Sequence, residues 1–154
     1  MRLLDYLDLR HILLDLKEPD RDAVFRRLVA ALHSSGAVTS VETPHKLLIE
    51  REELMTTGIH PGVAVPHAYT SEAPRTVCAL ARLAEEVDWN SLDGSKTSLV
   101  FCLLGPPEAT ETHLKLLARI AKLIDLPGAM DDLRMAATPD SLLALLRATE
   151  KRMH

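Results

Sequence analysis

The longest unbroken apolar run, residues 99–104, constrains the fold of this chain more than any other feature of its sequence. The run is far too short to cross a membrane, which takes about 20 residues. It lies between the turn signal Asp93-Gly94 and the breaker Gly105-Pro106-Pro107, so it predicts a strand. A second apolar run, residues 77–83, predicts another buried strand. A sheet is therefore expected in the core.

Helical patterns alternate with these extended segments. Pro19 and Asp20 open the first predicted helix, and Gly36 is its expected stop. A second helix is predicted to begin at Thr43 as the N-cap, with Pro44 in its first turn, and to end near residue 55. Further helices are predicted at 110–125, 127–135 and 139–147, and short extended segments at 11–16, 63–66 and 87–89. This alternation indicates the α/β class, with helices covering a small sheet in a single domain of residues 1–154.

The composition narrows the classes of protein that fit. The net charge is −4 and the basic residues are scattered, so there is no electrostatic footprint for nucleic acid. The N-terminus reaches Asp5 too soon for a signal peptide. Cys78 and Cys102 lie inside apolar runs and are expected to be buried thiols in a reducing compartment. We therefore expect a soluble, cytoplasmic protein with no inserted membrane segment.

Seven histidines offer the main reactive chemistry. His60, His67 and His113 lie where the backbone geometry is specialised, at a turn, after a proline and at a helix start. The other four lie at element ends or in polar surroundings and are expected to be solvated: His11, His33, His45 and His154.

His67 is the candidate nucleophile. Pro66 has a fixed φ and pushes Val65 toward an extended conformation, so the chain reaches His67 along a stiff path. Such a path suits a group that must be held still for in-line attack. The alternative is a histidine satisfied within the core.

His113 lies in the first turn of the helix predicted to begin near Thr110. The partial positive charge of a helix N-terminus disfavours a protonated imidazole, so a neutral, hydrogen-donating ring is expected. The free N–H groups of this turn could also hold an anion such as phosphate. The alternative is a partly exposed residue at a helix start.

Arg51 is expected to point inward. On the predicted helix, Leu47, Leu48, Leu54 and Met55 define an apolar face, and Arg51 falls in its middle. An inward cation needs an anionic partner, and a phosphoryl group fits arginine well. The alternative is an arginine whose stem covers the core while its head reaches solvent.

Together these residues supply a nucleophile, a neutral imidazole and a cation. No acidic pair, Cys–His arrangement or phosphate-binding glycine-rich loop competes with them. A metal site from His60, His67 and His113 has no spacing rule in its favour, so no metal is predicted.

The stretches Arg51-Glu52, Thr56-Thr57-Gly58-Ile59 and Gly62-Val63-Ala64-Val65-Pro66-His67-Ala68, followed by Thr112-His113-Leu114, resemble the fructose/mannitol-type (type 2) enzyme IIA domains of the bacterial sugar phosphotransferase system, including the nitrogen-regulatory branch. The resemblance spans nearly the whole chain. It implies a small mixed β-sheet flanked by helices.

The resemblance also implies a function. The histidine matching His67 accepts a phosphoryl group from the phosphocarrier HPr, or its nitrogen-branch counterpart, and passes it to a IIB partner. His113 matches the second active-site histidine and Arg51 the active-site arginine. Thr57, Gly58 and His60 are expected around the phosphoryl pocket. No cofactor is required.

The chain departs from the family pattern at two places. Thr56 replaces the usual serine, and His60 stands where the family usually has a glycine that could adopt a positive φ. Three roles stay open: a carrier for a sugar permease, a nitrogen-type regulator whose phosphorylation state controls partner proteins, and a non-catalytic binding module on the same fold.

Overall fold

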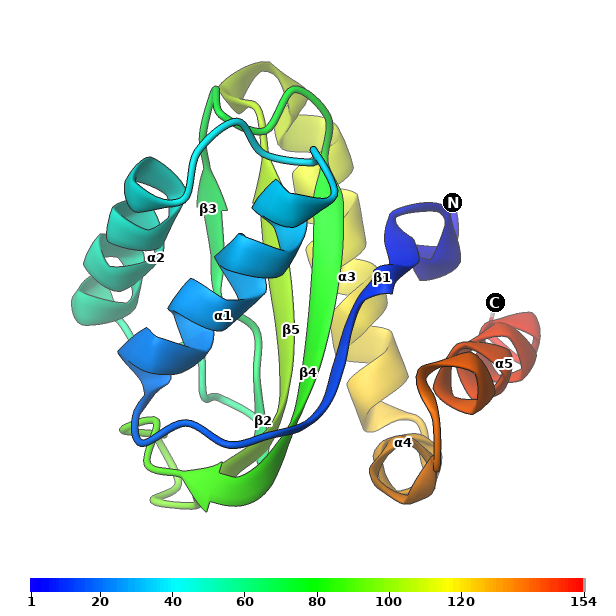
Figure 1. Ribbon diagram of the computed structural model, residues 1–154. Coiled ribbons are helices and arrows are strands. Elements are labelled where there is room, and N and C mark those ends of the chain that lie inside the picture. Colours follow the sequence, from blue (N-terminus) through cyan, green and yellow to red (C-terminus); the bar gives the residue numbers. More distant parts are fainter. Residues whose placement is uncertain (154) are drawn as a thin grey trace.

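A five-stranded mixed sheet runs through the middle of the molecule (Figure 1). The computed structural model describes residues 1–153. The path order is β1 (Leu7–Leu16), β4 (Val77–Val87), β5 (Thr97–Gly105) and β2 (Val63–Ala64), and β3 (His67–Tyr69) also pairs with β5. Only the β4–β5 pair is antiparallel among these pairings. The predicted small mixed sheet is therefore confirmed.

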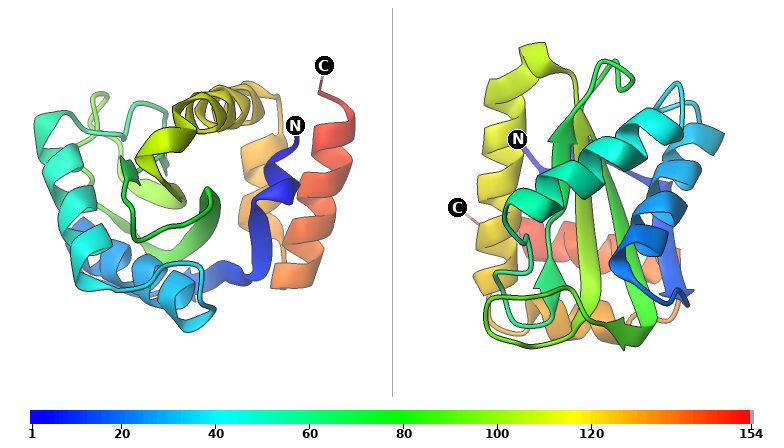
Figure 2. Two further views of the ribbon diagram at one scale, coloured as in Figure 1. Left: turned by 90° about the horizontal axis from the view of Figure 1, so that it is seen from above. Right: turned by 90° about the vertical axis from the view of Figure 1, so that its left-hand side faces the viewer.

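Helices cover both faces of this sheet (Figure 2). One face carries α1 (Arg21–Ser34) and α2 (Glu42–Leu54), and the other carries α3 (Thr110–Asp125), α4 (Ala129–Met135) and α5 (Pro139–Lys151). Two short 3₁₀ turns, Leu3–Asp5 and Pro107–Ala109, precede β1 and α3. In the part of the chain that is described, none of the helices is long and apolar enough to cross a bilayer.

Strand β5 explains why residues 99–104 must all be apolar. Val100, Cys102 and Leu104 pack against the side of α1 and α2, while Leu99, Phe101 and Leu103 pack against the side of α3 to α5. Side chains alternate between the faces of a strand, so a strand covered on both sides has no position for a polar residue.

The edge strand beside β5 is interrupted at a proline. Val63 pairs with Leu99 and His67 with Leu103, so β2 and β3 keep one register along β5 across the interruption. Pro66 has no N–H, but its carbonyl accepts from the Leu103 N–H at 3.0 Å. Successive backbone groups of a strand point to opposite sides, so the backbone N–H and C=O of Val65 face away from β5. This geometry frees the Val65 carbonyl for another partner.

Several predicted boundaries were wrong; the strand predicted at 77–83, for example, extends to Val87, and the helix predicted at 127–135 begins at Ala129. Strand β1 begins at Leu7 rather than residue 11, and the predicted segment 87–89 is partly the end of β4. Thr43 is not the N-cap of α2, because the helix already begins at Glu42 after Val41. Pro44 thereby falls at the third helical position, where a backbone N–H has no intrahelical acceptor and a proline is tolerated.

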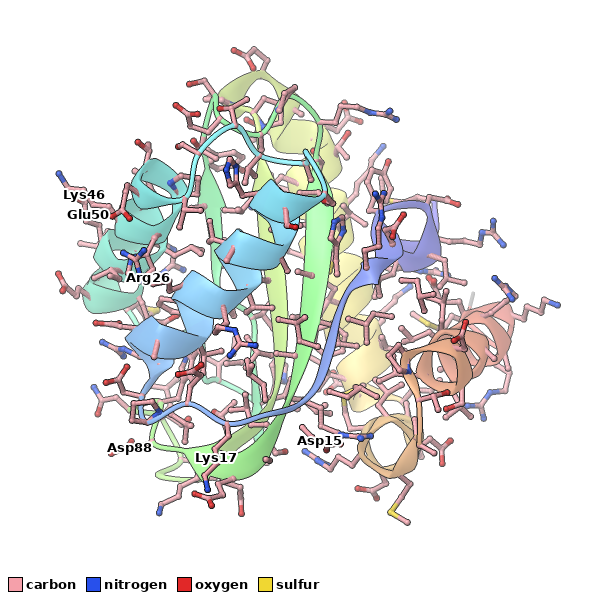
Figure 3. The ribbon with its side chains drawn as sticks, viewed as in Figure 1. Asp15, Lys17, Arg26, Lys46, Glu50 and Asp88 are labelled. Carbon is pink, nitrogen blue, oxygen red and sulfur yellow. The ribbon has the colours of Figure 1, made fainter. Side chains whose placement is uncertain are left out.

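Charged side chains lie mainly on the outer surfaces, as Figure 3 shows for Lys46 and Glu50 on α2. Arg26 of α1 donates to Glu42 of α2 at 2.9 Å, which links the two helices at their exposed side. Glu50 is exposed. The two cysteines, Cys78 and Cys102, are buried free thiols, as predicted.

Candidate active site around His67 and His113

The ring of His67 is held by a backbone carbonyl two residues earlier in the chain. Its Nδ1 lies 2.7 Å from the carbonyl oxygen of Val65. A carbonyl can only accept, so Nδ1 carries the hydrogen and Nε2 keeps the lone pair. The pKa of His67 is lowered, chiefly because the half-buried ring loses solvation and in part because of the Arg51 cation; the bond to Val65 and the charge of Glu52 act the other way. His67 is thus a neutral imidazole with Nε2 available.

His113 packs against His67 from the first turn of α3. The two ring centroids are 5.7 Å apart, and the ring of Tyr69 lies on His113 at 4.2 Å. Burial, with a smaller contribution from His67, lowers the pKa of His113 to about 4. The neutral ring predicted from the sequence is therefore present, although burial rather than the helix dipole is its main cause.

Among the described residues, 1–153, neither ring nitrogen of His113 has a hydrogen-bond partner. A neutral imidazole has one N–H donor, and buried donors are rarely left without an acceptor. An oxyanion beside His67 would supply that missing acceptor.

The predicted orientation of α2 was wrong. Leu54 and Met55 are exposed, while Glu52 is only 2% exposed and faces the interior together with Pro44 and Leu48. These three buried residues are spaced four apart, which places them on one helical face. The inward charge on α2 is therefore a carboxylate rather than a guanidinium.

Arg51 lies at the rim instead. Its side chain is half-buried, and Nη1 donates to the carbonyl oxygen of Met55 at 2.9 Å near the end of α2. This bond holds the Arg51 side chain beside His67. The positive charge of Arg51 lowers the pKa of His67. The half-buried position of Arg51 agrees in part with the alternative of an arginine whose head reaches solvent. Arg51 nevertheless lines the same cavity as the candidate nucleophile, His67.

Glu52 holds the loop that follows α2. Its Oε2 accepts from the backbone N–H of Thr57 at 2.5 Å, and its Oε1 accepts from the Thr57 hydroxyl at 2.6 Å. The carbonyl of Thr57 in turn accepts from the Val65 N–H at 3.3 Å. A hydrogen-bonded path therefore runs from Glu52 through Thr57 and Val65 to the ring of His67.

These groups meet at a cavity of about 210 Å³. Arg51, Thr57, His60 and His67 line it, together with a mainly apolar remainder: Met55, Thr56, Ile59, Val65, Leu117 and Ala121. The structure thus brings the predicted residues from α2, the following loop and β3 to one place. His113 does not line the cavity, but its ring packs against the ring of His67, which does.

Gly58 and His60 differ in their relation to this cavity. Gly58 does not line it; a Cβ there would lie 2.4 Å from Ser91 Oγ, so the glycine is required for close packing. His60 lines the cavity and does not have a positive φ, whereas Gly62 has a φ of 74°. The turn therefore needs no glycine at position 60.

Two residues near the site were missed from the sequence. Tyr69 stands two residues after His67 in β3, so strand periodicity could have placed both on one side. Glu52 gave only the weak signal of standing four residues after Leu48 on a helix.

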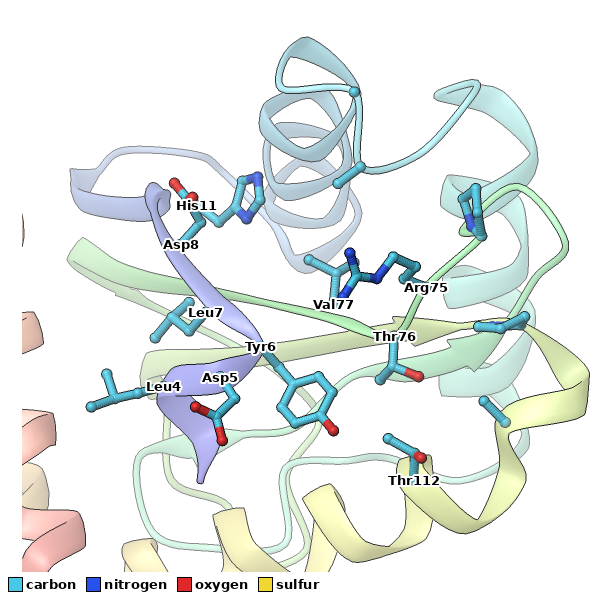
Figure 4. A pocket seen from close by; sticks show the side chains of 15 residues that line it. Leu4, Asp5, Tyr6, Leu7, Asp8, His11, Arg75, Thr76, Val77 and Thr112 are labelled. Atoms are coloured by element: carbon cyan, nitrogen blue, oxygen red, sulfur yellow. The ribbon is translucent and has the colours of Figure 1, made fainter. Parts of the chain in front are cut away.

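A separate cavity of about 580 Å³ lies near the start of β1, where Tyr6, His11 and Arg75 are part of its lining (Figure 4). The prediction that His11 is solvated was wrong, because it is 3% exposed and its Nε2 lies 2.6 Å from Ser35 Oγ. Burial lowers the pKa of His11. His67 and Arg51 do not line this cavity.

The remaining histidines lie apart from the site. His33 is exposed, as predicted, while His45 is half-buried and contacts the carbonyl oxygen of Asp22 at 2.9 Å. His154 lies outside the described residues. Within residues 1–153, no cluster of three or more His, Cys, Asp or Glu side chains is arranged to hold a metal ion.

Comparison with known proteins agrees with this geometry. A sequence model of the family described as "Phosphoenolpyruvate-dependent sugar phosphotransferase system, EIIA 2" matches residues 5–149. The nitrogen regulatory protein of Pseudomonas aeruginosa is 38% identical over 105 residues, which cover 68% of this chain and 68% of that protein. The fructose-specific EIIABC component of Bacillus subtilis is 27% identical over 98% of this chain, which spans only 24% of that relative's length.

A similar fold is found in a solved structure. The nitrogen regulatory protein IIA-Ntr from Neisseria meningitidis superposes with a TM-score of 0.86 at 28% identity, covering 94% of this chain and 98% of that one. The similarity therefore extends over the sheet and the helices on both of its faces.

Proposed function

Because the chain belongs to the EIIA type 2 family of the phosphoenolpyruvate-dependent sugar phosphotransferase system, we propose that it carries a phosphoryl group on His67, taken from an HPr-like donor and passed to a IIB protein. The observation that carries this proposal is the hydrogen bond from Nδ1 to Val65, which leaves Nε2 of a neutral ring as the free nucleophile. We also propose that the protein acts in the cytoplasm, as expected for a component of a phosphoenolpyruvate-dependent transfer system.

The chemical step is an in-line transfer between two nitrogens. The Nε2 lone pair forms the new P–N bond while the bond from phosphorus to the donor's histidine breaks, and that electron pair stays with the donor. The ring of His67 then carries positive charge, which its Nδ1–H shares with the Val65 carbonyl. In the transfer to the IIB partner, His67 is the donor: the P–N bond to Nε2 breaks, its electron pair returns to Nε2, and a nucleophile of the IIB protein forms the new bond to phosphorus. Because the transition state is loose, the protein mainly positions and neutralises the group.

Arg51 and His113 are suited to the phosphoryl oxygens. Arg51 presents a fixed cation at the rim of the cavity, and His113 presents an N–H without a protein acceptor. Charge-assisted bonds of this kind are stronger than neutral ones. Thr57 and His60 complete the polar lining.

The surface around the cavity suits brief encounters with partner proteins. Leu54, Met55 and Ile59 are exposed on one side, and Leu114 is exposed on α3. Apolar residues gathered around a reactive group are typical of interaction sites. Arg51 and His67 line one cavity and the ring of His113 packs against His67, an arrangement that supports transfer over the non-catalytic binding module.

A regulatory role is the second candidate. The nitrogen regulatory relative is 38% identical over 105 residues and the fructose-specific component is 27% identical over 98% of this chain, so relatives of both branches match. In that role the phosphorylation state of His67 would control the binding of target proteins. Comparing pull-downs with phosphorylated and unphosphorylated protein separates this role from sugar transport, because a carrier alone has no state-specific targets beyond IIB.

The direct test is phosphorylation in a purified system. With phosphoenolpyruvate, enzyme I and HPr, the wild type should gain an acid-labile phosphate, and ³¹P NMR should place it on Nε2. His67→Ala should gain none. A wild type that stays unphosphorylated, or a variant that still takes the group, would overturn the proposal.

A further inference from the structure

Glu52 is an unusual residue to find in the interior. Its side chain is only 2% exposed, and both of its carboxylate oxygens accept hydrogen bonds from a single residue, Thr57. Burying a carboxylate is costly unless its charge is compensated, so a purely structural tether would be better served by a neutral side chain. A buried negative charge at position 52 is therefore better explained by an effect on the neighbouring His67 site than by stability alone.

The bonds of Glu52 lead to the candidate nucleophile without interruption. Thr57 is fixed through both its N–H and its hydroxyl, which leaves its carbonyl to accept from Val65 at 3.3 Å. Val65 faces away from β5 and offers its own carbonyl to His67 Nδ1 at 2.7 Å. Pro66 has no N–H and interrupts the hydrogen bonding between β5 and the edge strand. On the side that faces away from β5, the Val65 N–H is bound by the Thr57 carbonyl.

The charge of Glu52 also reaches the ring. It favours the positively charged form of His67, opposing the effect of Arg51. A ring phosphorylated on Nε2 with hydrogen on Nδ1 carries the same kind of positive charge. Glu52 thus stabilises the product of the transfer, whereas burial and, to a smaller extent, the Arg51 cation favour the neutral form of the free ring.

We propose that Glu52 is a positioning residue for phosphoryl transfer, which fixes the tautomer and orientation of His67 through Thr57 and Val65 and offsets the charge that the ring acquires. This role rests on the proposed function. Glu52 touches neither the phosphoryl group nor the ring, and it acts only through the intervening backbone and through its field.

The test compares Glu52→Gln with Glu53→Gln in the full chain. The glutamine at 52 keeps the size but loses the charge. Its oxygen can still accept from the Thr57 N–H, while its NH₂ group must donate to the Thr57 hydroxyl and so reverses the direction of that bond. Glu53 is the adjacent exposed carboxylate, so its variant makes the same charge change without touching the path. Thr57→Val, which removes one of the two bonds, is the second variant.

Two readouts are measured besides thermal unfolding. The ¹⁵N chemical shifts of the His67 ring report which nitrogen carries the hydrogen, and rapid-quench mixing with phospho-HPr reports the transfer rate. Glu52→Gln should reduce the Nδ1–H population and slow transfer about 10–100-fold, as expected for a misplaced reacting group. Thr57→Val should change the ring shifts in the same direction by less, and Glu53→Gln should match the wild type.

The outcomes separate this proposal from the one it rests on. A folded Glu52→Gln with wild-type ring shifts and rate would overturn the proposal. A slow variant with unchanged ring shifts would overturn the effect of Glu52 on the tautomer and orientation of the ring, and would support only its effect on the charge. If Glu52→Gln does not fold, Thr57→Val decides by the same two readouts. If wild-type His67 takes no phosphate, the proposed function fails, while the ring shifts still show whether Glu52 sets the tautomer.

Discussion

The ring of Tyr69 lies on the ring of His113, with centroids 4.2 Å apart and planes tilted by 36°. His113 is only 1% exposed beneath it, whereas Tyr69 is 37% exposed. Tyr69 is therefore part of the surface that keeps His113 dry, and dryness is what keeps His113 neutral. The neutral state of His113 therefore depends in part on Tyr69, a residue that the sequence motifs did not indicate.

Tyr69→Ala should raise the pKa of His113 from about 4 toward its ordinary value of 6.5. Removing the phenol ring admits water, and water stabilises the protonated imidazole. The pKa is measured by NMR titration of the imidazole carbon-bound protons of His113 in the wild type and in the variant. A pKa that stays near 4 would show that Tyr69 does not cause the burial.

The stability of the protein should fall as the pH drops from about 6.5 toward about 4. His113 has a lower pKa in the folded state than in the unfolded state, so the unfolded state binds its proton first in this window. Stability from this group is complete above pH 6.5 and decreases as the pH falls. Urea unfolding at pH 7 and pH 5 should show a smaller pH effect in His113→Gln than in the wild type.

That comparison measures the effect of His113 together with its interaction with His67, because the two rings are coupled. His11 also has a lowered pKa but lies at a separate cavity, so it contributes equally to the wild type and to the variant. An identical loss of stability in both proteins would contradict a depressed pKa at His113.

The sheet could be predicted from the sequence because its signal is local. Residues 99–104 form a strand covered on both faces, and such a strand must be apolar at every position. The position of His67 could be predicted for a similar reason, since Pro66 constrains the backbone next to it.

Side-chain partners distant in the sequence could not be predicted. His11 is buried by contact with Ser35, and Glu52 by contact with a loop whose path depends on β2 and β3. Leu54 is apolar yet 84% exposed, which misled the assignment of the buried face of α2. Hydrophobicity does not distinguish a core residue from one at an interaction surface.

Arg51→Gln should slow phosphorylation of His67 roughly 100-fold, the usual effect of losing a charge-stabilising donor. It should also raise the pKa of His67, because the Arg51 cation opposes protonation of the ring. A protonated ring has no lone pair to attack, so the acid limb of the pH–rate profile should move to higher pH. Arg147→Gln, an exposed change on α5, is the control. An unmoved acid limb would contradict the electrostatic effect of Arg51.

Gly58→Ala should destabilise the protein by about 1–3 kcal/mol, the usual cost of overpacking. The new Cβ would lie 2.4 Å from Ser91 Oγ and 3.2 Å from Ser91 Cβ, so the two loops must separate. Ser91→Gly removes both of these atoms and should recover part of the loss when combined with Gly58→Ala. A double-mutant cycle by urea unfolding measures this coupling, and simple additivity would contradict the contact. Because the Gly58 N–H and the Thr57 carbonyl belong to the same loop, Gly58→Ala should also disturb the ring shifts of His67, whereas Ser91→Gly alone should leave them in place.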